Sequence, residues 1–463
     1  MTVSANTTQI TVDFTARTGN RIKPMHGVGQ PPIIRGMPGV NPQLFHYLEE
    51  AGIPYSRLHD AGGSFGGGVF VDVPNIFRDF DADEDDPASY DFVFTDILIQ
   101  RLKDYNVETF YRLGITIENA ADIKAYHVYP PKDFAKWARI CEHIIRHYNE
   151  GWANGFTLGI RYWEIWNEPD VCFNPNETAQ TWHGGREEFF RFYETASKHL
   201  KACFGDTIAV GGYASIGFLG HEEWDPCLEG VDQAYVNADN PRAYRIDYAH
   251  RFLSYVREHH CPLDYFSWHC YSSPAGILEC ADYCRRLLTK YGFGDTPDIL
   301  NEWNTYRTNP KYRGTPKVAA DTFAVLLGAQ KTSTALLCYY DARIGQSVYG
   351  GMFDPMTYEP LLTYYGFKSF NMAYKLGEET ESASSDPDVY VLSARNAGKG
   401  ILLIANTKEE ELTLHFDIKG AGTEEAEVLI TDEQYLYTYL GEIIKQNQLT
   451  VKAHSCIEIR FAL

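Results

Sequence analysis

The sequence predicts a (β/α)8 (TIM) barrel followed by a smaller β-sandwich domain. The chain has 463 residues, more than the ~250 that such a barrel typically needs. Eight short apolar runs alternate with segments of helical period over residues 21–375, and short strand-like runs replace the helices after that. We therefore expect a barrel at 21–375 and a sandwich at 376–463.

Strand-like runs and helical segments alternate along the predicted barrel. The runs cover residues 25–28, 55–59, 109–113, 162–166, 208–212, 265–271, 299–303 and 335–340. The helical segments cover residues 42–51, 95–105, 134–147, 186–203, 248–258, 278–291, 319–331 and 364–375. Such alternation indicates parallel βα units, and eight units favour a closed barrel over a doubly wound sheet.

The C-terminal part has the pattern of an all-β domain. Five short runs, at 389–393, 400–405, 411–416, 427–430 and 456–461, are separated by turn-like or charged stretches. Residues 9–14 also alternate apolar and polar, which is typical of a strand. We expect this lone N-terminal strand, within segment 1–20, to join the C-terminal sandwich.

Charge and cysteine usage narrow the class of protein. The net charge is −21, which disfavours nucleic acid and anionic membranes as partners. The first residues lack the basic and apolar regions of a secretory signal, and no apolar window approaches ~18 residues. Ten scattered cysteines without a CxxC pair indicate free thiols. We expect a cytoplasmic protein. The sequence does not decide between a monomer and a homo-oligomer.

Nothing in the sequence indicates a cofactor or a metal. The glycine-rich stretch 62–68 is not followed by the Lys-Ser/Thr of a phosphate loop. The acidic run 79–86 is interpreted as a solvated loop, because its spacing is not that of a calcium motif. No His or Cys pair has firm zinc-ligand spacing on one element.

The strongest motif is Trp166-Asn167-Glu168-Pro169 at the end of the fourth predicted strand. Active sites of these barrels lie at the C-terminal ends of the strands. Glu164 shares the parity of Glu168 but lies deeper in the strand, so Glu168 is the carboxylate that a substrate can reach. Asn167 offers an amide suited to a hydroxyl group.

A second motif closes the seventh predicted strand. It reads Asn301-Glu302-Trp303-Asn304 and again places a glutamate beside aromatic and amide side chains. A closed barrel brings Glu168 and Glu302 to one rim. Two carboxylates across a cleft are what cleavage of a glycosidic bond needs, one protonated as the acid and one ionised.

Together the two motifs resemble the clan A retaining glycoside hydrolases, most closely family 39, which includes β-xylosidases and α-L-iduronidases. The resemblance spans residues 21–375. It implies that Glu168 is the acid/base, Asn167 the ligand of the sugar 2-hydroxyl, and Glu302 the nucleophile. A C-terminal β-domain also fits this family.

Further candidates lie at other strand ends. Arg57 and His59 resemble the arginine that contacts the nucleophile and a sugar-binding histidine, although a structural ion pair is the alternative for Arg57. Tyr271 resembles the tyrosine that donates to the nucleophile, and His269 a neighbour of the sugar or the acid. Taken alone, His269 and Tyr271 could simply fill the barrel.

The eighth strand departs from the clan pattern. Many members offer a tryptophan there as a platform for the sugar, whereas this chain has Tyr339 and Tyr340. Either tyrosine could stack on the sugar, and Trp303 is a further aromatic candidate. His26 and Gln30, at the first strand, are expected either at the floor of the sugar site or in a core or loop role.

The predicted function is a retaining glycoside hydrolase, β-xylosidase-like and exo-acting, with a carbohydrate substrate. The exo prediction depends on long loops at 62–87 and 171–185. An α-L-arabinofuranosidase is the nearest alternative, because the segment around Glu302 also resembles the nucleophile motif of family 51. An alternative of another class is a barrel that binds carbohydrate without turnover.

Overall fold

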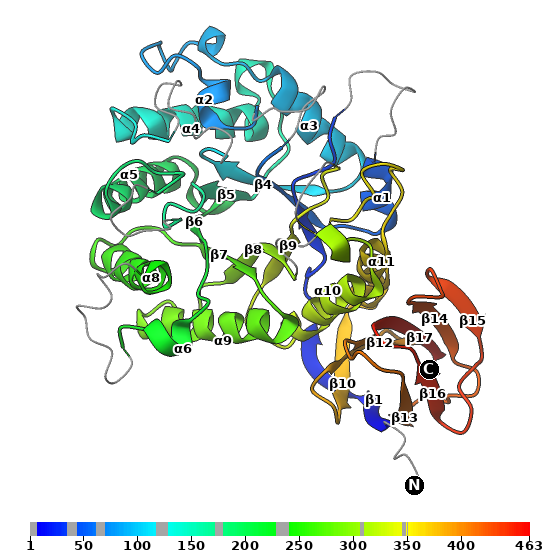
Figure 1. Cartoon of the computed structure of the whole chain (residues 1–463). Coiled ribbons are helices and arrows are strands. Elements are labelled where there is room, and N and C mark those ends of the chain that lie inside the picture. The colour runs from blue at the N-terminus through cyan, green and yellow to red at the C-terminus, as the bar shows by residue number, and fades with distance from the viewer. Residues whose placement is uncertain are drawn as a thin grey trace.

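The computed structural model describes residues 7–34, 44–61, 70–116, 128–171, 179–227, 240–305, 310–344, 349 and 351–463. Eight parallel strands close into the expected barrel (Figure 1). They are β2 (Gly27–Gly29), β3 (Tyr55–Leu58), β4 (Glu108–Leu113), β5 (Tyr162–Ile165), β6 (Ala209–Ser215), β7 (Tyr265–Tyr271), β8 (Asp298–Asn304) and β9 (Leu336–Tyr339).

Helices surround this barrel on the outside (Figure 1). The longer ones are α3 (Val93–Asp104), α4 (Phe134–Asn149), α5 (Arg186–Phe204), α8 (Pro241–Glu258), α9 (Pro274–Lys290), α10 (Pro316–Ala329) and α11 (Leu362–Leu376), with shorter turns at α1 (Phe45–Glu50), α2 (Val73–Ile76) and α6 (His221–Trp224). Helix α8 begins earlier than its apolar period predicts. The cause is an N-cap, because Asn240 accepts from the amides of Arg242 and Ala243 and a proline follows it.

Side-chain alternation builds the barrel interior in layers. An apolar cluster fills its lower part and comprises Phe110, Ala209, Tyr265, Ile299, Leu336 and Cys338, with Tyr55 and Tyr162 packed against it. Two residues further along β3, β4 and β5 stand Arg57, Arg112 and Glu164, all fully buried. Charged side chains therefore sit directly above an apolar floor, on the side toward the C-terminal ends of the strands.

The second domain is a separate mixed sheet of nine strands in the order β15-β14-β17-β12-β11-β10-β1-β13-β16. Its members are β1 (Thr7–Arg21), β10 (Glu378–Ser384), β11 (Val389–Arg395), β12 (Lys399–Asn406), β13 (Leu412–Lys419), β14 (Glu427–Thr431), β15 (Thr438–Gly441), β16 (Gln448–Val451) and β17 (Ser455–Ala462). Strands near both edges of the sheet, such as β14 and β16, contribute to one apolar core. The sheet therefore curls around this core.

The N-terminal strand is an interior member of that sheet. β1 pairs antiparallel with β10 and parallel with β13, with Ile10 opposite both Ser384 and Phe416. Strand β10 was not predicted, because its sequence EETESAS has no apolar alternation. The opposite face of the sheet contacts α10 and α11 through β11 and β12, and Leu392 and Leu403 belong to the barrel's own core cluster.

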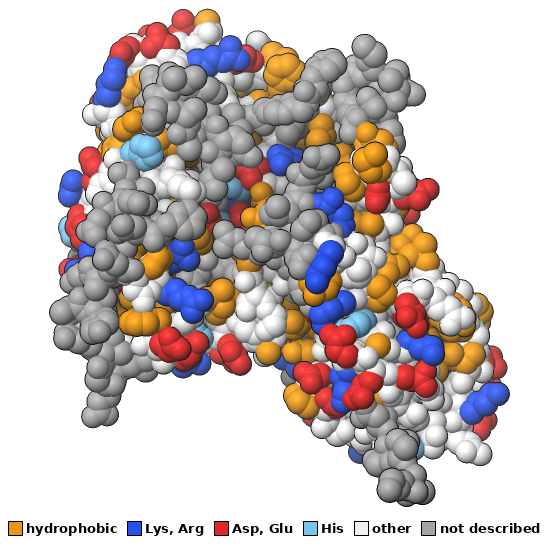
Figure 2. All heavy atoms as spheres, viewed as in Figure 1, with side chains coloured by type: hydrophobic (Ala, Val, Ile, Leu, Met, Phe, Trp, Pro, Cys, Tyr) orange, Lys and Arg blue, Asp and Glu red, His pale blue; other side chains and the backbone are white. Residues whose placement is uncertain are grey.

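Most of the acidic run is exposed to solvent, as the sequence suggested, and only Glu84 among its carboxylates is partly buried. Glu84 is bound by Lys136 and Arg139 of α4, and Asp81 by Lys132. These ion pairs attach the acidic segment to the helix layer. On the face shown in Figure 2, acidic and basic side chains intermingle. None of the described helices combines the length and hydropathy needed to cross a bilayer.

Candidate active site

Glu168 reaches the barrel mouth from a turn rather than from a strand. Strand β5 ends at Ile165, and both Trp166 and Glu168 have positive φ, 73° and 47°. The alternation of side chains along the strand therefore stops before Glu168. The turn, and not the even spacing from Glu164, sets the direction of the Glu168 side chain. The amide of Glu168 donates to the carbonyl of Ala214, and Thr181 donates to the carbonyl of Glu168. These bonds hold a backbone conformation that costs on the order of 1–3 kcal/mol per residue.

Glu302 faces the same space from β8. The pairing of β8 shifts register between Leu300 and Trp303, and the pairing with β7 shifts near His269. At this irregularity the consecutive side chains of Asn301 and Glu302 both contact barrel-interior groups, Glu164 and Arg57 respectively. A regular strand would send one of them outward.

The two glutamates and His269 form a compact buried cluster. One atom from each lies within 4.8 Å of the others. His269 Nδ1 is 2.7 Å from Glu168 Oε1 and 3.7 Å from Glu302 Oε2. Glu168 and Glu302 each keep only 7% of their surface exposed, so both carboxyls are largely shielded but open at one side.

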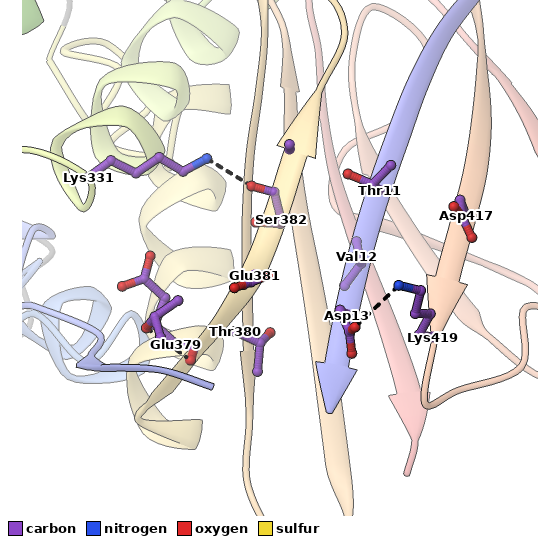
Figure 3. Close-up of a pocket in the computed structure, with 12 residues that line it drawn as sticks. Thr11, Val12, Asp13, Lys331, Glu379, Thr380, Glu381, Ser382, Asp417 and Lys419 are labelled. Carbon is purple, nitrogen blue, oxygen red and sulfur yellow. Dashed lines mark hydrogen bonds and ion pairs between the residues drawn. The ribbon is translucent and has the colours of Figure 1, made fainter. Parts of the chain in front are cut away.

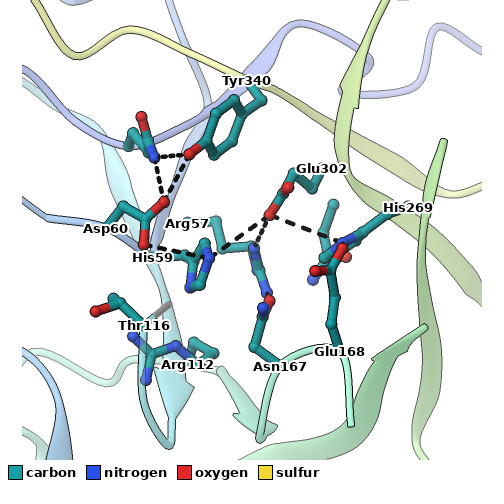
Figure 4. A network of polar contacts seen from close by, with 12 residues as sticks. Arg57, His59, Asp60, Arg112, Thr116, Asn167, Glu168, His269, Glu302 and Tyr340 are labelled. Carbon is teal, nitrogen blue, oxygen red and sulfur yellow. Dashed lines mark hydrogen bonds and ion pairs between the residues drawn. The ribbon is translucent and has the colours of Figure 1, made fainter. Parts of the chain in front are cut away.

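Arg57 connects the cluster to the layer below (Figure 4). Its Nη1 donates to Glu302 Oε2 at 3.1 Å, its Nη2 to Asn167 Oδ1 at 2.7 Å, and its Nε to Glu164 Oε2 at 2.8 Å. Burial alone would lower the pKa of this guanidinium, but Glu164 and Glu302 outweigh it and raise the pKa. Arg57 is thus a fixed cation that orients an amide and two carboxylates.

Competing influences act on Glu302. Burial raises its pKa above the usual range, and the charge of Glu168 acts in the same direction. His269, Arg57 and a hydrogen bond of 2.6 Å from the Tyr271 hydroxyl oppose the rise. Burial, reinforced by Arg57, lowers the pKa of His269 to about 4, so this ring is neutral at neutral pH.

A second polar group lines the opposite side of the mouth (Figure 4). Tyr340 and Gln30 both donate to Asp60 Oδ2 at 2.6 Å, and Gln30 also contacts the Tyr340 hydroxyl. His59 Nε2 lies 3.4 Å from Asp60 Oδ1 and 3.8 Å from Glu302 Oε2. Burial followed by the charge of Arg57 lowers the pKa of His59 well below its usual value. Asp60 was missed, although it directly follows His59 at the end of β3.

Three predicted site residues do not reach this mouth. Trp303 and Tyr339 are fully buried in the core between the barrel and its helices, with ring centroids 5.2 Å apart. His26 precedes β2, donates from Nε2 to the carbonyl of Gly52 at 3.0 Å and packs on Phe370. Strand alternation explains the positions of Trp303 and Tyr339, because their neighbours Glu302 and Tyr340 point into the barrel.

Metal-ligand groups occur at the site and elsewhere. Glu168, His269 and Glu302 could surround an ion, but Arg57 already contacts Glu302 Oε2, and its charge opposes a second cation there. Glu142, His199 and Cys203 form another such group on α4 and α5. Arg146 donates to that glutamate at 2.8 Å, so the group is also explained as an ion-pair network.

An open pocket on the sheet domain lies apart from these residues (Figure 3). Its lining includes Thr11, Asp13, Lys331, Ser382 and Lys419 and no aromatic ring. Lys331 donates to the carbonyl of Ser382 at 3.2 Å, and Lys419 lies 3.6 Å from Asp13. Both lysines of this pocket thus already have partners, and its lining has no aromatic ring on which a sugar would stack.

A closed βα-barrel with two buried glutamates at its C-terminal mouth has the architecture of a glycoside hydrolase. The chain belongs to the glycosyl hydrolases family 39, whose sequence profile matches residues 41–408. This range contains both motifs from which the resemblance was inferred, and it confirms that resemblance.

Individual relatives agree with the family. The curated β-xylosidase of Geobacillus stearothermophilus is 24% identical over 268 residues, which are 56% of this chain and 44% of the relative, so the match spans less than half of that protein. A glucosidase from Croceicoccus marinus has a TM-score of 0.75 at 18% identity, covering 98% of this chain and 99% of its own. A monomeric β-xylosidase from Caulobacter crescentus has a TM-score of 0.65 at 16% identity, with the same coverage. These structures share the whole fold.

Proposed function

We propose that this protein is a retaining glycosidase that removes a terminal β-linked xylose from short glycosides, with Glu302 as nucleophile and Glu168 as acid and base. The observation that carries the proposal is the pair of glutamates on one rim, with oxygens within 4.8 Å. Retaining enzymes hold their carboxyl groups ~5–5.5 Å apart, whereas inverting enzymes need ~6.5–9.5 Å to admit water.

The surroundings of the two carboxyls support this division of roles. Arg57 and Tyr271 both donate to Glu302, which favours its ionised form over that of Glu168. Glu168 faces the neutral ring of His269 instead. Because two carboxylates this close disfavour double ionisation, a proton retained on Glu168 also helps to keep Glu302 charged.

The reaction then runs by double displacement. Glu302 attacks the anomeric carbon while Glu168 donates its proton to the leaving oxygen, and a glycosyl ester on Glu302 results. Glu168, now a carboxylate, takes a proton from water, which attacks the anomeric carbon and releases Glu302. The sugar leaves with its original anomeric configuration.

Several buried polar atoms are suited to bind the sugar hydroxyls. Asn167 Nδ2, His59 Nδ1 and Asp60 Oδ1 have no hydrogen-bond partner among the described residues. Asn167 is bound by Arg57, His59 lies 3.8 Å from Glu302, and Asp60 lies 3.4 Å from His59, so all three belong to residues at the mouth. A bound hydroxyl would satisfy groups that are costly to leave unpaired, so we assign these side chains to the sugar site with Asn167 at the 2-hydroxyl.

The sugar itself is inferred from the relatives' names, which include two β-xylosidases and a glucosidase. An α-L-arabinofuranoside is the competing substrate. The exo mode was predicted from loops at 62–87 and 171–185, of which 62–69 and 172–178 lie outside the described residues.

The test is hydrolysis of aryl glycosides by the wild type, Glu168→Gln, Glu302→Gln and the matched control Glu442→Gln, which changes an exposed glutamate of the sheet domain. The panel contains β-xyloside, α-L-arabinofuranoside, β-glucoside, β-galactoside and α-L-iduronide. We expect steady-state turnover of the β-xyloside by the wild type and the control, and loss of that turnover in both site variants. Preference for the arabinofuranoside would contradict the proposed substrate. Sugar binding without turnover by the wild type would contradict the proposed enzymatic activity.

Trapping identifies the nucleophile directly. A 2-deoxy-2-fluoro-β-xyloside with a good leaving group slows the second step, so the glycosyl ester accumulates. Peptide mass spectrometry should find the added sugar on Glu302. Label on Glu168, or complete inactivation without label, would contradict the assigned roles.

A further inference from the structure

Asp170 is a buried carboxylate close to the site that the double displacement does not use. It follows Glu168 by two residues and has no exposed surface. Ser215 Oγ donates to its Oδ2 at 2.8 Å, and the amide of Ile216 donates to its Oδ1 at 3.1 Å. Ser215 is the last residue of β6, and Ile216 follows it. Each oxygen of Asp170 is therefore bound by the end of the neighbouring barrel strand.

The donors at the end of β6 are themselves held in place. The amide of Gly217 donates to Ser215 Oγ at 3.2 Å. This bond occupies a lone pair of the hydroxyl and leaves its single hydrogen for Asp170. The amide of Ala214 donates to Ser267 Oγ of β7 at 2.9 Å, which ties the segment to the next strand. The end of β6 thus presents two fixed donors to Asp170.

The same strand end also binds Glu168. Regular pairing of β5 with β6 has already stopped at this level. The amide of Glu168 instead donates to the carbonyl of Ala214 at 3.0 Å. The turn is therefore attached to β6 at two points, the backbone of Glu168 and the side chain of Asp170, with Pro169 between them. Because proline fixes its own φ, little freedom is left between the two points.

Both attachments are needed because Glu168 has a left-handed backbone. Its φ is 47°, which a residue other than glycine keeps only where the surroundings enforce it. The bond from the Glu168 amide constrains the N-terminal side of this residue. Its C-terminal side is held by Asp170 and by two donors to the Glu168 carbonyl, Thr181 at 2.6 Å and the amide of Val171 at 3.0 Å. Without Asp170 the turn can relax toward negative φ, which would move the Glu168 side chain.

Resting on the proposed function, we propose that Asp170 is a positioning residue, whose bonds to the end of β6 hold the Glu168 turn in place and keep the acid/base 2.7 Å from His269. The carboxylate of Asp170 binds β6 and exchanges no proton with substrate or water. Its effect on both steps of the reaction depends on the place of Glu168. A displacement of about 1 Å at a reacting group can cost roughly 100-fold in rate.

Kinetics separate this role from a general loss of stability. In Asp170→Ala the acid/base is present but displaced, so the loss should depend on the leaving group. We expect kcat/KM to fall roughly 100-fold for phenyl and alkyl glycosides of the preferred sugar. It should change little for the 2,4-dinitrophenyl glycoside, whose departure needs no acid. Azide should restore kcat for that substrate, because it attacks the anomeric carbon without a base, releases Glu302 and forms a glycosyl azide.

The matched control is Asp298→Asn. Asp298 is also a fully buried aspartate of the barrel, but it lies at the N-terminal end of β8, where it binds Arg285 and Thr334. Any loss of rate in this control should be equal for all leaving groups. Ser215→Ala removes one bond to Asp170 and should give the leaving-group pattern in a milder form. Added to Asp170→Ala, it should change little more, because both substitutions remove the same contact.

A crystal structure of Asp170→Ala tests the position of Glu168 without any substrate. The proposal expects the Glu168 carboxyl to leave His269 while the barrel strands stay unchanged. A carboxyl that stays on His269, or an equal loss of rate for all leaving groups, would overturn the positioning role while the glycosidase assignment stands.

Two further outcomes are covered by the same measurements. If the wild type cleaves no glycoside, the proposed function fails, and the crystal structure still decides whether Asp170 holds Glu168 in place. If Asp170→Ala does not fold, Ser215→Ala takes its place in the kinetics and in the crystal, with the same result required.

Discussion

The hydroxyl of Tyr271 donates a hydrogen bond of 2.6 Å to Oε1 of Glu302, and Arg57 binds the other oxygen of this carboxyl. The hydrogen bond lowers the pKa of Glu302 against the rise caused by burial. Arg57 is fully buried and Tyr271 is partly buried, so water competes little with the arginine and only in part with the hydroxyl. Tyr271 thereby helps to keep the proposed nucleophile ionised.

Replacement of Tyr271 by phenylalanine should therefore change the pH profile. Without the donor the pKa of Glu302 rises, and less of it is ionised at a given acidic pH. The acidic limb of kcat/KM should move to higher pH. A hydrogen bond to a charged group contributes about 1.5–3 kcal/mol, so we expect a loss of roughly 10- to 100-fold at the optimum. An acidic limb that stays in place would show that Tyr271 does not act on Glu302.

Removal of Arg57 should affect stability as well as activity. Arg57→Leu leaves Glu164 as a buried carboxylate without its cation, which typically costs about 3–5 kcal/mol. Urea unfolding monitored by tryptophan fluorescence gives the free energy of unfolding. The double variant Arg57→Leu/Glu164→Leu should regain a large part of the loss. Equal stability of the single and double variants would contradict the pairing.

Replacement of Glu168 by glutamine should be selective for the leaving group. General acid assistance is worth about 10²- to 10⁴-fold, and activated aryl groups need little of it. Glycosides with alkyl or unactivated aryl groups should lose nearly all activity in the first step. A 2,4-dinitrophenyl glycoside should still give a burst of phenol, because only its second step lacks the base. Equal loss for every leaving group would indicate that Glu168 is not the acid.

The two tyrosines that end the eighth barrel strand form a matched pair. Tyr340 donates to Asp60 at the mouth, whereas Tyr339 packs on Trp303 and Phe367 in the helix layer. Tyr340→Phe should reduce kcat/KM for the preferred glycoside roughly tenfold through the loss of one hydrogen bond to a carboxylate. Tyr339→Phe should leave KM unchanged. The reverse ranking would restore Tyr339 as the sugar platform.

Periodicity was sufficient to predict the barrel. All eight of its strands were located to within a few residues, because buried parallel strands are compact apolar runs separated by helices. Strands β10, β15 and β16 escaped, since β10 is mostly polar and β15 and β16 have only four residues each. Propensity carries no information on the partners with which such strands pair.

For the site, the sequence located strand ends better than side-chain directions. The positive φ of Trp166 and Glu168 and the register shift next to Glu302 are not visible in the pattern, yet they decide which side chains enter the cavity. Glu164 was set aside as too deep to react. Because Glu164 lies deep in the barrel, it can bind Arg57 and Asn301. A buried carboxylate is costly without a partner, so its predicted inward position already implied one.

The position of β1 constrains the order of events during synthesis. Ile10, Val12 and Phe14 belong to the core of the C-terminal sheet, and their strand pairs with β10 and β13. Ribosomes add about 5–20 residues per second, so this strand waits roughly 20–80 s for residues 378–419 to be made. During that interval its alternating apolar side chains and both unpaired edges are exposed to other chains. Closure of the sheet joins β1 to strands that are made much later, so it cannot precede the synthesis of β10 and β13.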